Sequence, residues 1–185
     1  MRPNCGSRNL VRATRPPLSA FRNPPMRLLL FALAVIALAS PVAAAPIDLI
    51  VVDKSRRVMT LWTGKKPFRT YRIALGGNPV GDKEQEGDSR TPEGRYTIDG
   101  KNPGSSFHLS LRISYPNKKD SADAARRGVS PGGLIMIHGT PGYFGVLQST
   151  GVIRDWTAGC IAVSNEEVEE IYKNVRIGTP IVIKP

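Results

Sequence analysis

The sequence predicts a mainly β domain with two short helices, built as a β-sandwich or a partly closed barrel of mixed sheets. Two observations lead to this fold class. From Ile47 to the end of the chain, seven or more short segments rich in β-branched and aromatic residues are separated by turns that contain Gly and Pro. Only two stretches have the composition and the flanking residues of a helix, and both are short.

The expected strands are three to eight residues long. They cover residues 47–52, 58–62, 68–75, 95–98, 107–113, 134–137, 161–163 and 179–183. Residues 53–56 form the first predicted turn, and Gly64 closes the second. Residues 76–94 hold five glycines and two prolines, which predicts a long polar loop. Pro180 suits the beginning of a strand or a sheet edge, because proline has no N–H to donate to a neighbouring strand.

Two helices complete the predicted fold. Residues 121–127 predict a short helix that ends at Gly128. Ser164 and Glu167 have the spacing of a capping box, so a second helix is expected to run to about Asn174 with Val168 and Ile171 or Tyr172 facing inward.

The N-terminal residues predict export. Residues 26–44 have a basic start, a twelve-residue apolar run over residues 28–39 and a small-residue site for cleavage after Ala44, which together are typical of a signal peptide. An uncleaved membrane anchor is the alternative. Residues 1–25 are either a disordered basic extension or the result of a start-site error, so residues 45–185 are expected to form the functional domain in the periplasm or cell envelope.

The net charge of the whole chain overstates how basic this domain is. The formal charge of the chain is +11, but six arginines fall within its first 27 residues. Residues 46–185 carry twenty Lys and Arg against fifteen Asp and Glu, which leaves +5. Because the aromatic residues are few and scattered, the pattern argues against nucleic-acid binding, whereas a mild positive charge suits an anionic cell envelope.

Residues 45–185 contain a single cysteine, Cys160. An exported domain with one cysteine cannot form an internal disulfide, so the thiol is inert in the core, paired with another chain, or free because it reacts. His138 follows the apolar segment 134–137 and precedes Gly139, where a sheet can hold its side chain beside a cleft. His138 and Cys160 are therefore a candidate base and nucleophile.

The chemistry of a thiol gives the neighbouring residues possible roles. A free thiol near its unperturbed pKa is only a few per cent ionised at neutral pH, so it needs a base within hydrogen-bonding reach. Gly159 lets the backbone turn sharply before Cys160, and the N–H groups of these two residues are candidate donors to an oxyanion. A buried and inert thiol remains the alternative at this stage.

The chain from Ile47 onward resembles the catalytic domain of the L,D-transpeptidases of the YkuD type, cysteine enzymes that remodel peptidoglycan. The matching segments are residues 47–62, 74–77, 90–94, 137–140 and 159–161. The resemblance implies a mainly β fold with its active site under a loop. It also implies that Cys160 is the nucleophile, that His138 is the general base, and that Gly139 supports the imidazole through its backbone carbonyl. The family's Ser or Thr, three residues before the cysteine, corresponds to Thr157.

The reaction that this resemblance implies needs no metal or cofactor. The cysteine attacks the third residue of a tetrapeptide stem of peptidoglycan, the terminal D-alanine leaves, and an amine of another stem or of an envelope protein resolves the thioester. A hydrolase that cuts stem peptides or peptidoglycan–protein links is the alternative, and a wall-binding module without activity is a third possibility. Such a module would be expected to lack the His138 and Cys160 pair.

Two positions depart from the pattern of the family. Many members have His before the Gly-Cys pair and Arg or Asn two residues after the cysteine, whereas this chain has Ala158 and Ala162. A substrate carboxylate must then be bound elsewhere. The candidate cations are Arg90, Arg112 and Arg154. His108 is either a further groove residue or a packed strand histidine.

Overall fold

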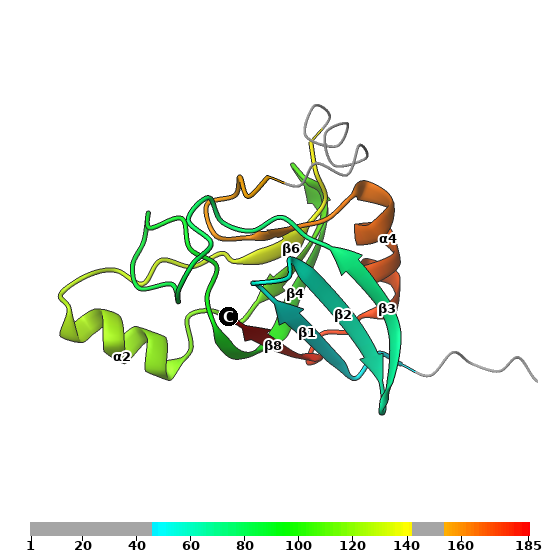
Figure 1. The fold of residues 1–185 in the computed structure, drawn as a ribbon, viewed down its shortest axis with the longest axis horizontal. Helices are drawn as coiled ribbons and strands as arrows, with labels where there is room; N and C mark the ends of the chain where they lie inside the picture. The colour runs from blue at the N-terminus through cyan, green and yellow to red at the C-terminus, as the bar shows by residue number, and fades with distance from the viewer. Residues whose placement is uncertain (1–45, 142–153) are drawn as a thin grey trace, which may run out of the picture. The chain divides into compact units, whose positions relative to one another are not determined.

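The computed structural model describes residues 46–141 and 154–185, which contain an eight-stranded mixed sheet and two helices (Figure 1). The expected extension 1–25 and signal peptide 26–44 lie outside the described residues. The strands are β1 (Leu49–Asp53), β2 (Val58–Thr63), β3 (Lys66–Arg72), β4 (Gly94–Ser105), β5 (His108–Ile113), β6 (Met136–His138), β7 (Ile161–Ala162) and β8 (Pro180–Lys184). The helices are α2 (Lys118–Arg126) and α4 (Asn165–Asn174).

The strands form one curled sheet in the order β3-β2-β1-β8-β4-β5-β6-β7. The pairs β1–β8 and β6–β7 are parallel, and the other pairs are antiparallel. β4 pairs with β8 through residues 94–97 and with β5 from Ile98 onward, and the register shifts between Ile98 and Gly100. Since a bulge bends a strand, β4 turns one half of the sheet toward the other. Of the two expected architectures, the partly closed barrel is therefore confirmed.

Helix α4 packs against the inner face of this sheet. Val168 and Ile171 are fully buried in the core, while Tyr172 is only half-buried. The expected capping box is present, with Ser164 Oγ accepting from Glu167 N at 3.2 Å and Glu167 Oε2 accepting from Ser164 N at 2.9 Å. The prediction of this helix and of its two ends is confirmed.

Helix α2 begins three residues earlier than the sequence predicted. Asn117, not a residue near Ser121, is its N-cap: Asn117 Oδ1 accepts from Lys119 N at 2.8 Å and from Asp120 N at 3.1 Å. Asp120 completes the capping box by accepting from Asn117 N at 2.9 Å. Ser121 lies in the first turn and donates its hydroxyl to Asn117 O at 2.9 Å, so its polar side chain does not mark the end of the helix.

The bounds of several strands differ from those expected, because pairing rather than composition determines them. β1 begins at Leu49 instead of residue 47, and β3 begins at Lys66 instead of residue 68. β3 ends at Arg72 instead of residue 75, and the next segment leaves β2 and forms a bridge from Ala74 to Ala162. β4 continues to Ser105 in a long hairpin with β5. β6 begins at Met136, two residues later than expected. Neither of the two helices in the described part of the chain is long and apolar enough to cross a membrane.

Candidate active site

Cys160 and His138 lie on the same face of the sheet, at the ends of neighbouring strands. His138 is the last residue of β6, and Cys160 directly precedes β7. The two strands run parallel with His138 opposite Ala162, so Cys160, two residues before Ala162, projects to the same side as His138. Hydrogen bonds in both directions between Ala74 and Ala162, each 2.9 Å from N to O, hold the other side of β7.

The imidazole of His138 is buried and oriented by the backbone. Its Nδ1 lies 2.6 Å from the carbonyl oxygen of Gly139, and the side chain is 3% exposed. Because a carbonyl oxygen only accepts, Nδ1 carries the proton and Nε2 is left as a proton acceptor. Burial lowers the pKa of His138 from its ordinary 6.5, and the bond to Gly139 opposes that effect in part. At neutral pH the ring is therefore an uncharged base.

The thiol of Cys160 is also held in its neutral form. Burial raises its pKa, while the Met136 N–H and the charge of Lys83 act in the opposite direction. Cys160 Sγ donates to the carbonyl of Leu134 at 3.5 Å. Within residues 46–141 and 154–185, Sγ makes no hydrogen bond to His138, a contact that often tightens only when substrate binds.

Two aromatic rings surround the imidazole of His138. The Phe107 ring centroid lies 4.5 Å from that of His138 with the planes 33° apart, and the Trp156 centroid lies 5.7 Å away at 66°. The two aromatic rings are themselves 6.0 Å apart. Phe107 was expected only as a strand residue, but it lies just before β5 and packs on the imidazole.

Two glycines of the site occupy positions that no other residue fits. A Cβ on Gly139 would collide with Asn165 Oδ1 and lie 2.8 Å from the carbonyl oxygen of Phe107. Gly159 has φ +132°, and a Cβ there would lie 2.6 Å from the carbonyl oxygen of Arg90. The close approach of neighbouring atoms therefore explains why a glycine follows His138 and another glycine precedes Cys160.

Thr157 shapes the turn that leads into Cys160. Its hydroxyl donates to the carbonyl of Cys160 at 2.7 Å and accepts from Gly159 N at 3.1 Å. The N–H of Gly159 is thus used inside the turn, although the sequence analysis proposed it as an oxyanion donor. The N–H of Cys160 has no hydrogen-bond partner among the residues that the structure describes, so it remains a candidate donor.

A cavity of about 290 Å³ opens beside the thiol. Its lining residues come from β4, β5 and the segment that enters β6: Gly100, Lys101, Asn102, Ser110, Arg112, Leu134 and Met136. Leu134 accepts the hydrogen bond from Cys160 Sγ, and the Met136 N–H lowers the pKa of the same sulfur. Cys160 itself does not line the cavity, but two of the lining residues contact its sulfur, so the cavity lies next to the nucleophile. Arg112 is the half-exposed cation in this cavity.

The other predicted binding residues lie outside this cavity. Arg90 Nη1 donates to Asp82 O at 3.1 Å and lies 3.8 Å from Glu84 Oε2. His108 Nε2 forms a 2.7 Å pair with Glu169 on α4. Arg154 is exposed at the edge of the undescribed segment 142–153. Arg112 itself donates from Nε to Asp99 Oδ1 at 2.7 Å.

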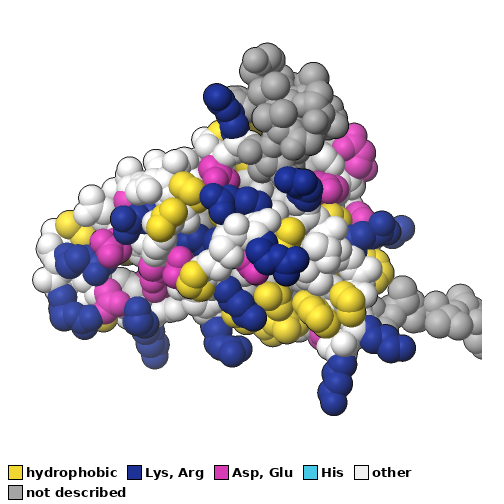
Figure 2. Space-filling view, in the orientation of Figure 1, with side chains coloured by type: hydrophobic (Ala, Val, Ile, Leu, Met, Phe, Trp, Pro, Cys, Tyr) yellow, Lys and Arg dark blue, Asp and Glu magenta, His cyan; other side chains and the backbone are white. Residues whose placement is uncertain are grey.

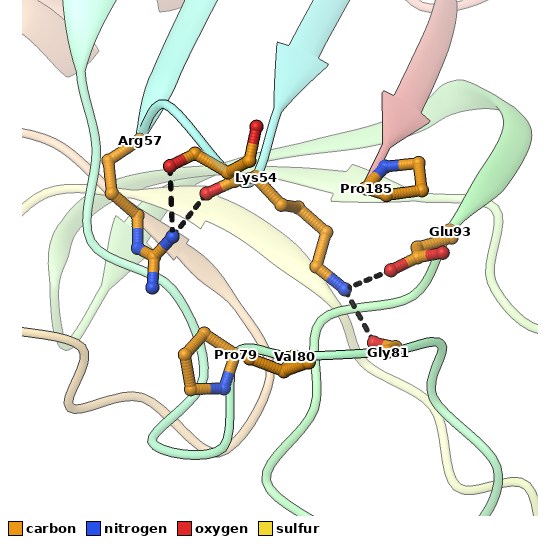
Figure 3. A pocket seen from close by; sticks show the side chains of 8 residues that line it. Lys54, Arg57, Pro79, Val80, Gly81, Glu93 and Pro185 are labelled. Atoms are coloured by element: carbon orange, nitrogen blue, oxygen red, sulfur yellow. Dashed lines mark hydrogen bonds and ion pairs between the residues drawn. The ribbon is translucent and has the colours of Figure 1, made fainter.

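A buried lysine anchors the loop that packs against the nucleophile. Lys54 is 2% exposed, and its ammonium donates to Gly81 O at 2.6 Å, Thr91 O at 2.9 Å and Glu93 Oε1 at 2.7 Å. Figure 3 shows this side chain pointing from the β1–β2 turn toward Gly81 and Glu93. Thr91 Oγ1 in turn accepts from Gly76 N at 3.0 Å. No local pattern indicates this role, because a lysine in a turn is ordinarily exposed.

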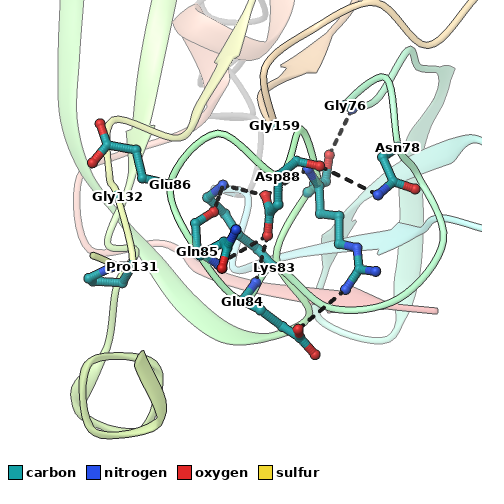
Figure 4. Close-up of polar contacts among 12 residues, drawn as sticks. Gly76, Asn78, Lys83, Glu84, Gln85, Glu86, Asp88, Pro131, Gly132 and Gly159 are labelled. Carbon is teal, nitrogen blue, oxygen red and sulfur yellow. Dashed lines mark hydrogen bonds and ion pairs between the residues drawn. The ribbon is translucent and has the colours of Figure 1, made fainter. Parts of the chain in front are cut away.

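The same loop is tied together internally around Asp88 (Figure 4). Although burial by itself would raise the pKa of Asp88, hydrogen bonds from Lys83 and from the N–H groups of Arg90, Glu84 and Gln85 hold it at about 2. Glu86 joins the loop to the segment after α2, with its N–H donating to Ser130 O at 2.8 Å. The loop is therefore held in a defined conformation by its own hydrogen bonds and by its contact with the segment after α2.

An ion pair fixes the segment just before the turn. Arg57 donates to the carboxylate of Asp155 from Nε at 3.0 Å and from Nη2 at 2.8 Å, and Asp155 Oδ1 also accepts from Leu75 N at 2.9 Å. Arg57 and Asp155 are 98 residues apart in the sequence, so no local pattern could have indicated the contact. Among the described residues, no group of three or more His, Cys, Asp or Glu side chains is placed to hold a metal ion.

A comparison with known protein families identifies the family to which this domain belongs. A family model for the L,D-transpeptidase catalytic domain, YkuD, matches residues 47–183. The chain belongs to the L,D-transpeptidase catalytic-domain family. The match covers both helices, His138, Cys160 and all the strands except the last residue of β8.

The individual relatives described next have sequence identities of 24–27% with this L,D-transpeptidase domain. YafK of Escherichia coli K12, which carries the same family name, is 27% identical over 108 residues, covering 57% of this chain and 36% of YafK. The crystal structure of the helical cell shape determining protein Pgp2 from Campylobacter jejuni has a TM-score of 0.59 and 27% identity, covering 75% of this chain and 47% of Pgp2. Bd1075 of Bdellovibrio bacteriovorus has a TM-score of 0.54 at 24% identity, covering 78% and 50%. The chain thus spans half or less of the length of these relatives.

Proposed function

We propose that this L,D-transpeptidase domain transfers acyl groups between peptidoglycan stem peptides through a thioester on Cys160. The observation that carries the proposal is the placement of Cys160 and His138 on one sheet face, with Nδ1 of the imidazole bonded to the Gly139 carbonyl and a cavity open beside the thiol. This arrangement supplies a nucleophile, a base of defined tautomer and room for a substrate.

The residues have the following roles in the proposed reaction. His138 Nε2 takes the thiol proton as Cys160 Sγ attacks the carbonyl carbon of the third stem residue. The imidazolium then gives that proton to the amine of the departing D-alanine, which leaves a thioester. The amine of a second stem attacks the thioester, His138 takes the proton of this amine, and the thiol is restored when the proton returns to sulfur.

The oxyanion of both tetrahedral intermediates needs a hydrogen-bond donor. The N–H of Cys160 fits this role, because it has no partner in the part of the chain that the structure describes and lies next to the reacting sulfur. Thr157 is a positioning residue in this account, since its hydroxyl fixes the turn on both sides of that N–H.

Substrate binding is assigned to the 290 Å³ cavity beside Cys160. Arg112 is the proposed carboxylate-binding residue, because it lines the cavity and its guanidinium is about half exposed. Arg90, Arg154 and His108 are less suited to this task, since none of the three lines the cavity.

The direct test is mass spectrometry of purified disaccharide tetrapeptides incubated with residues 44–185 and with the Cys160→Ala variant. We expect loss of D-alanine and new crosslinked dimers with the unmutated domain only. Shortened monomers without dimers would instead assign the hydrolase reaction, with water as the acceptor. No change with either protein would favour a wall-binding module without activity.

The setting of the reaction is part of the same proposal. The predicted signal peptide and the family both support an enzyme that works in the periplasm or cell envelope, where an envelope protein is a second possible acceptor. Pgp2 is named for determining helical cell shape, and we propose a comparable role in cell shape here. Deletion of the gene should change cell form, and only the form with Cys160 should restore it.

A further inference from the structure

The outer face of strands β1, β2 and β8, opposite the side that α4 covers, carries an apolar stripe. The register places Leu49 opposite Trp62 and Val51 opposite Val182, so these four side chains share one face. All four are half-buried, whereas their neighbours Ile50, Val52, Leu61 and Ile181 on the other face are fully buried. Figure 2 shows yellow side chains gathered over this part of the sheet with dark-blue side chains around them.

Basic residues surround this stripe on the same face. Arg72 lies opposite Val58, Lys184 opposite Asp53, and Arg95 opposite Val182. The adjoining turns add the exposed Arg56 and Lys65. None of these five cations is in a salt bridge with another described residue.

This face carries more than half of the net charge of the domain. The acidic residues beside the stripe are Asp53 and Asp48, and the oxygens of both accept backbone N–H groups. Five basic residues against two acidic ones leave +3, out of the +5 of residues 46–185. The net positive charge of the domain is therefore concentrated around the apolar stripe.

We propose that this face docks on an anionic lipid bilayer. A bilayer surface offers the two features that the face matches: negative headgroups, which attract nearby Lys and Arg, and an interfacial layer in which Trp and aliphatic side chains are buried. The cavity beside Cys160 is lined from β4, β5 and the segment entering β6. Docking through β1, β2 and β8 uses none of the residues that line it, so this proposal does not depend on the proposed reaction.

The experiment is co-sedimentation of residues 44–185, which form one compact unit, with vesicles. One set of vesicles is an equal mixture of phosphatidylglycerol and phosphatidylcholine, and the other is phosphatidylcholine alone. The test variant combines Arg72→Glu, Arg95→Glu and Lys184→Glu. The matched control combines Lys118→Glu, Arg126→Glu and Lys173→Glu, which changes the net charge equally with exposed residues of α2 and α4.

We expect binding to the anionic vesicles that falls about 100-fold in the test variant and by less than about threefold in the control. Trp62→Ala should weaken binding about tenfold in a folded protein, as checked by circular dichroism. Equal weakening by the two triple variants would overturn the proposal, because it would show attraction by net charge alone. A lack of binding to the anionic vesicles at low salt would also overturn the proposal. So would a dimer in solution that Trp62→Ala dissociates, since a second copy of the chain would then cover this face.

Discussion

At the scale of single residues, burial keeps both reacting groups uncharged. It raises the pKa of the Cys160 thiol from its ordinary 9.0 and lowers that of His138 from 6.5. Between these values the thiol holds its proton and the imidazole can accept it. We therefore expect proton transfer to accompany attack on the substrate, in contrast to cysteine enzymes that hold a thiolate–imidazolium pair at rest.

The pH dependence of alkylation tests this protonation state. Residues 44–185 contain only Cys160 as a thiol, so iodoacetamide reports on it alone. Because the thiol pKa is raised, the alkylation rate should climb about tenfold per pH unit from pH 6 to pH 9, in proportion to the thiolate fraction. A rate that stays constant from pH 5 to pH 8 would mean that the ion pair is already formed.

Gly139→Ala tests the support of the imidazole. The added Cβ collides with Asn165 Oδ1 and the Phe107 carbonyl, so the Gly139 carbonyl must move away from His138 Nδ1. We expect kcat/KM to fall about 100-fold, with a loss of about 1–3 kcal/mol in the free energy of unfolding.

Gly133→Ala is the matched control for this substitution, because nothing lies within 4 Å of its Cβ position. It should leave both the activity and the urea midpoint unchanged. Equal kinetics for the two variants would show that the carbonyl of Gly139 does not orient the base.

At the scale of elements, the loop between β3 and β4 acts as a brace for the nucleophile turn. The Arg90 carbonyl packs against Gly159, the Thr91 hydroxyl holds Gly76, and Lys54 binds the carbonyl of Thr91 and the carboxylate of Glu93. The segment Arg90–Gly94, one of those that resemble the family, therefore supports the nucleophile turn.

Lys54→Met measures the strength of this brace. The substitution leaves the carboxylate of Glu93, which is 19% exposed, and two carbonyls without their donor. We expect the free energy of unfolding to drop by about 3 kcal/mol in urea titrations. Lys65→Met, which removes an exposed turn cation, should change it by less than about 0.5 kcal/mol. A similar small effect from both would mean that Lys54 does not hold the loop.

The same elements explain what could be predicted. The capping box at Ser164 is local, so α4 was predicted to within a residue at both ends, and His138 stood out because an apolar strand leads directly to it. β4 continues to Ser105 in a hairpin with β5, although Pro103 and Gly104 do not favour a strand. The early end of β3 depends on a pairing partner far along the chain, which local patterns do not contain. The same reason hid Phe107, Lys54 and the Arg57–Asp155 pair.

At the scale of the whole molecule, β4 connects the two halves of the sheet. One half of the sheet consists of β3, β2, β1 and β8 and carries the apolar and basic outer face. The other half consists of β5, β6 and β7 and carries His138 and the edge at Cys160. The chain spans half or less of the length of the relatives described above. The chemistry proposed here therefore concerns the catalytic domain that the relatives share with this chain.

The most direct measurement of that chemistry is intact-protein mass spectrometry of residues 44–185 mixed with a tetrapeptide stem and quenched in acid within seconds. The account predicts a covalent adduct with the mass of the stem after loss of D-alanine, attached to Cys160 and absent from a folded Cys160→Ala variant. Release of D-alanine by the Cys160→Ala variant, or an adduct on any other residue, would contradict it.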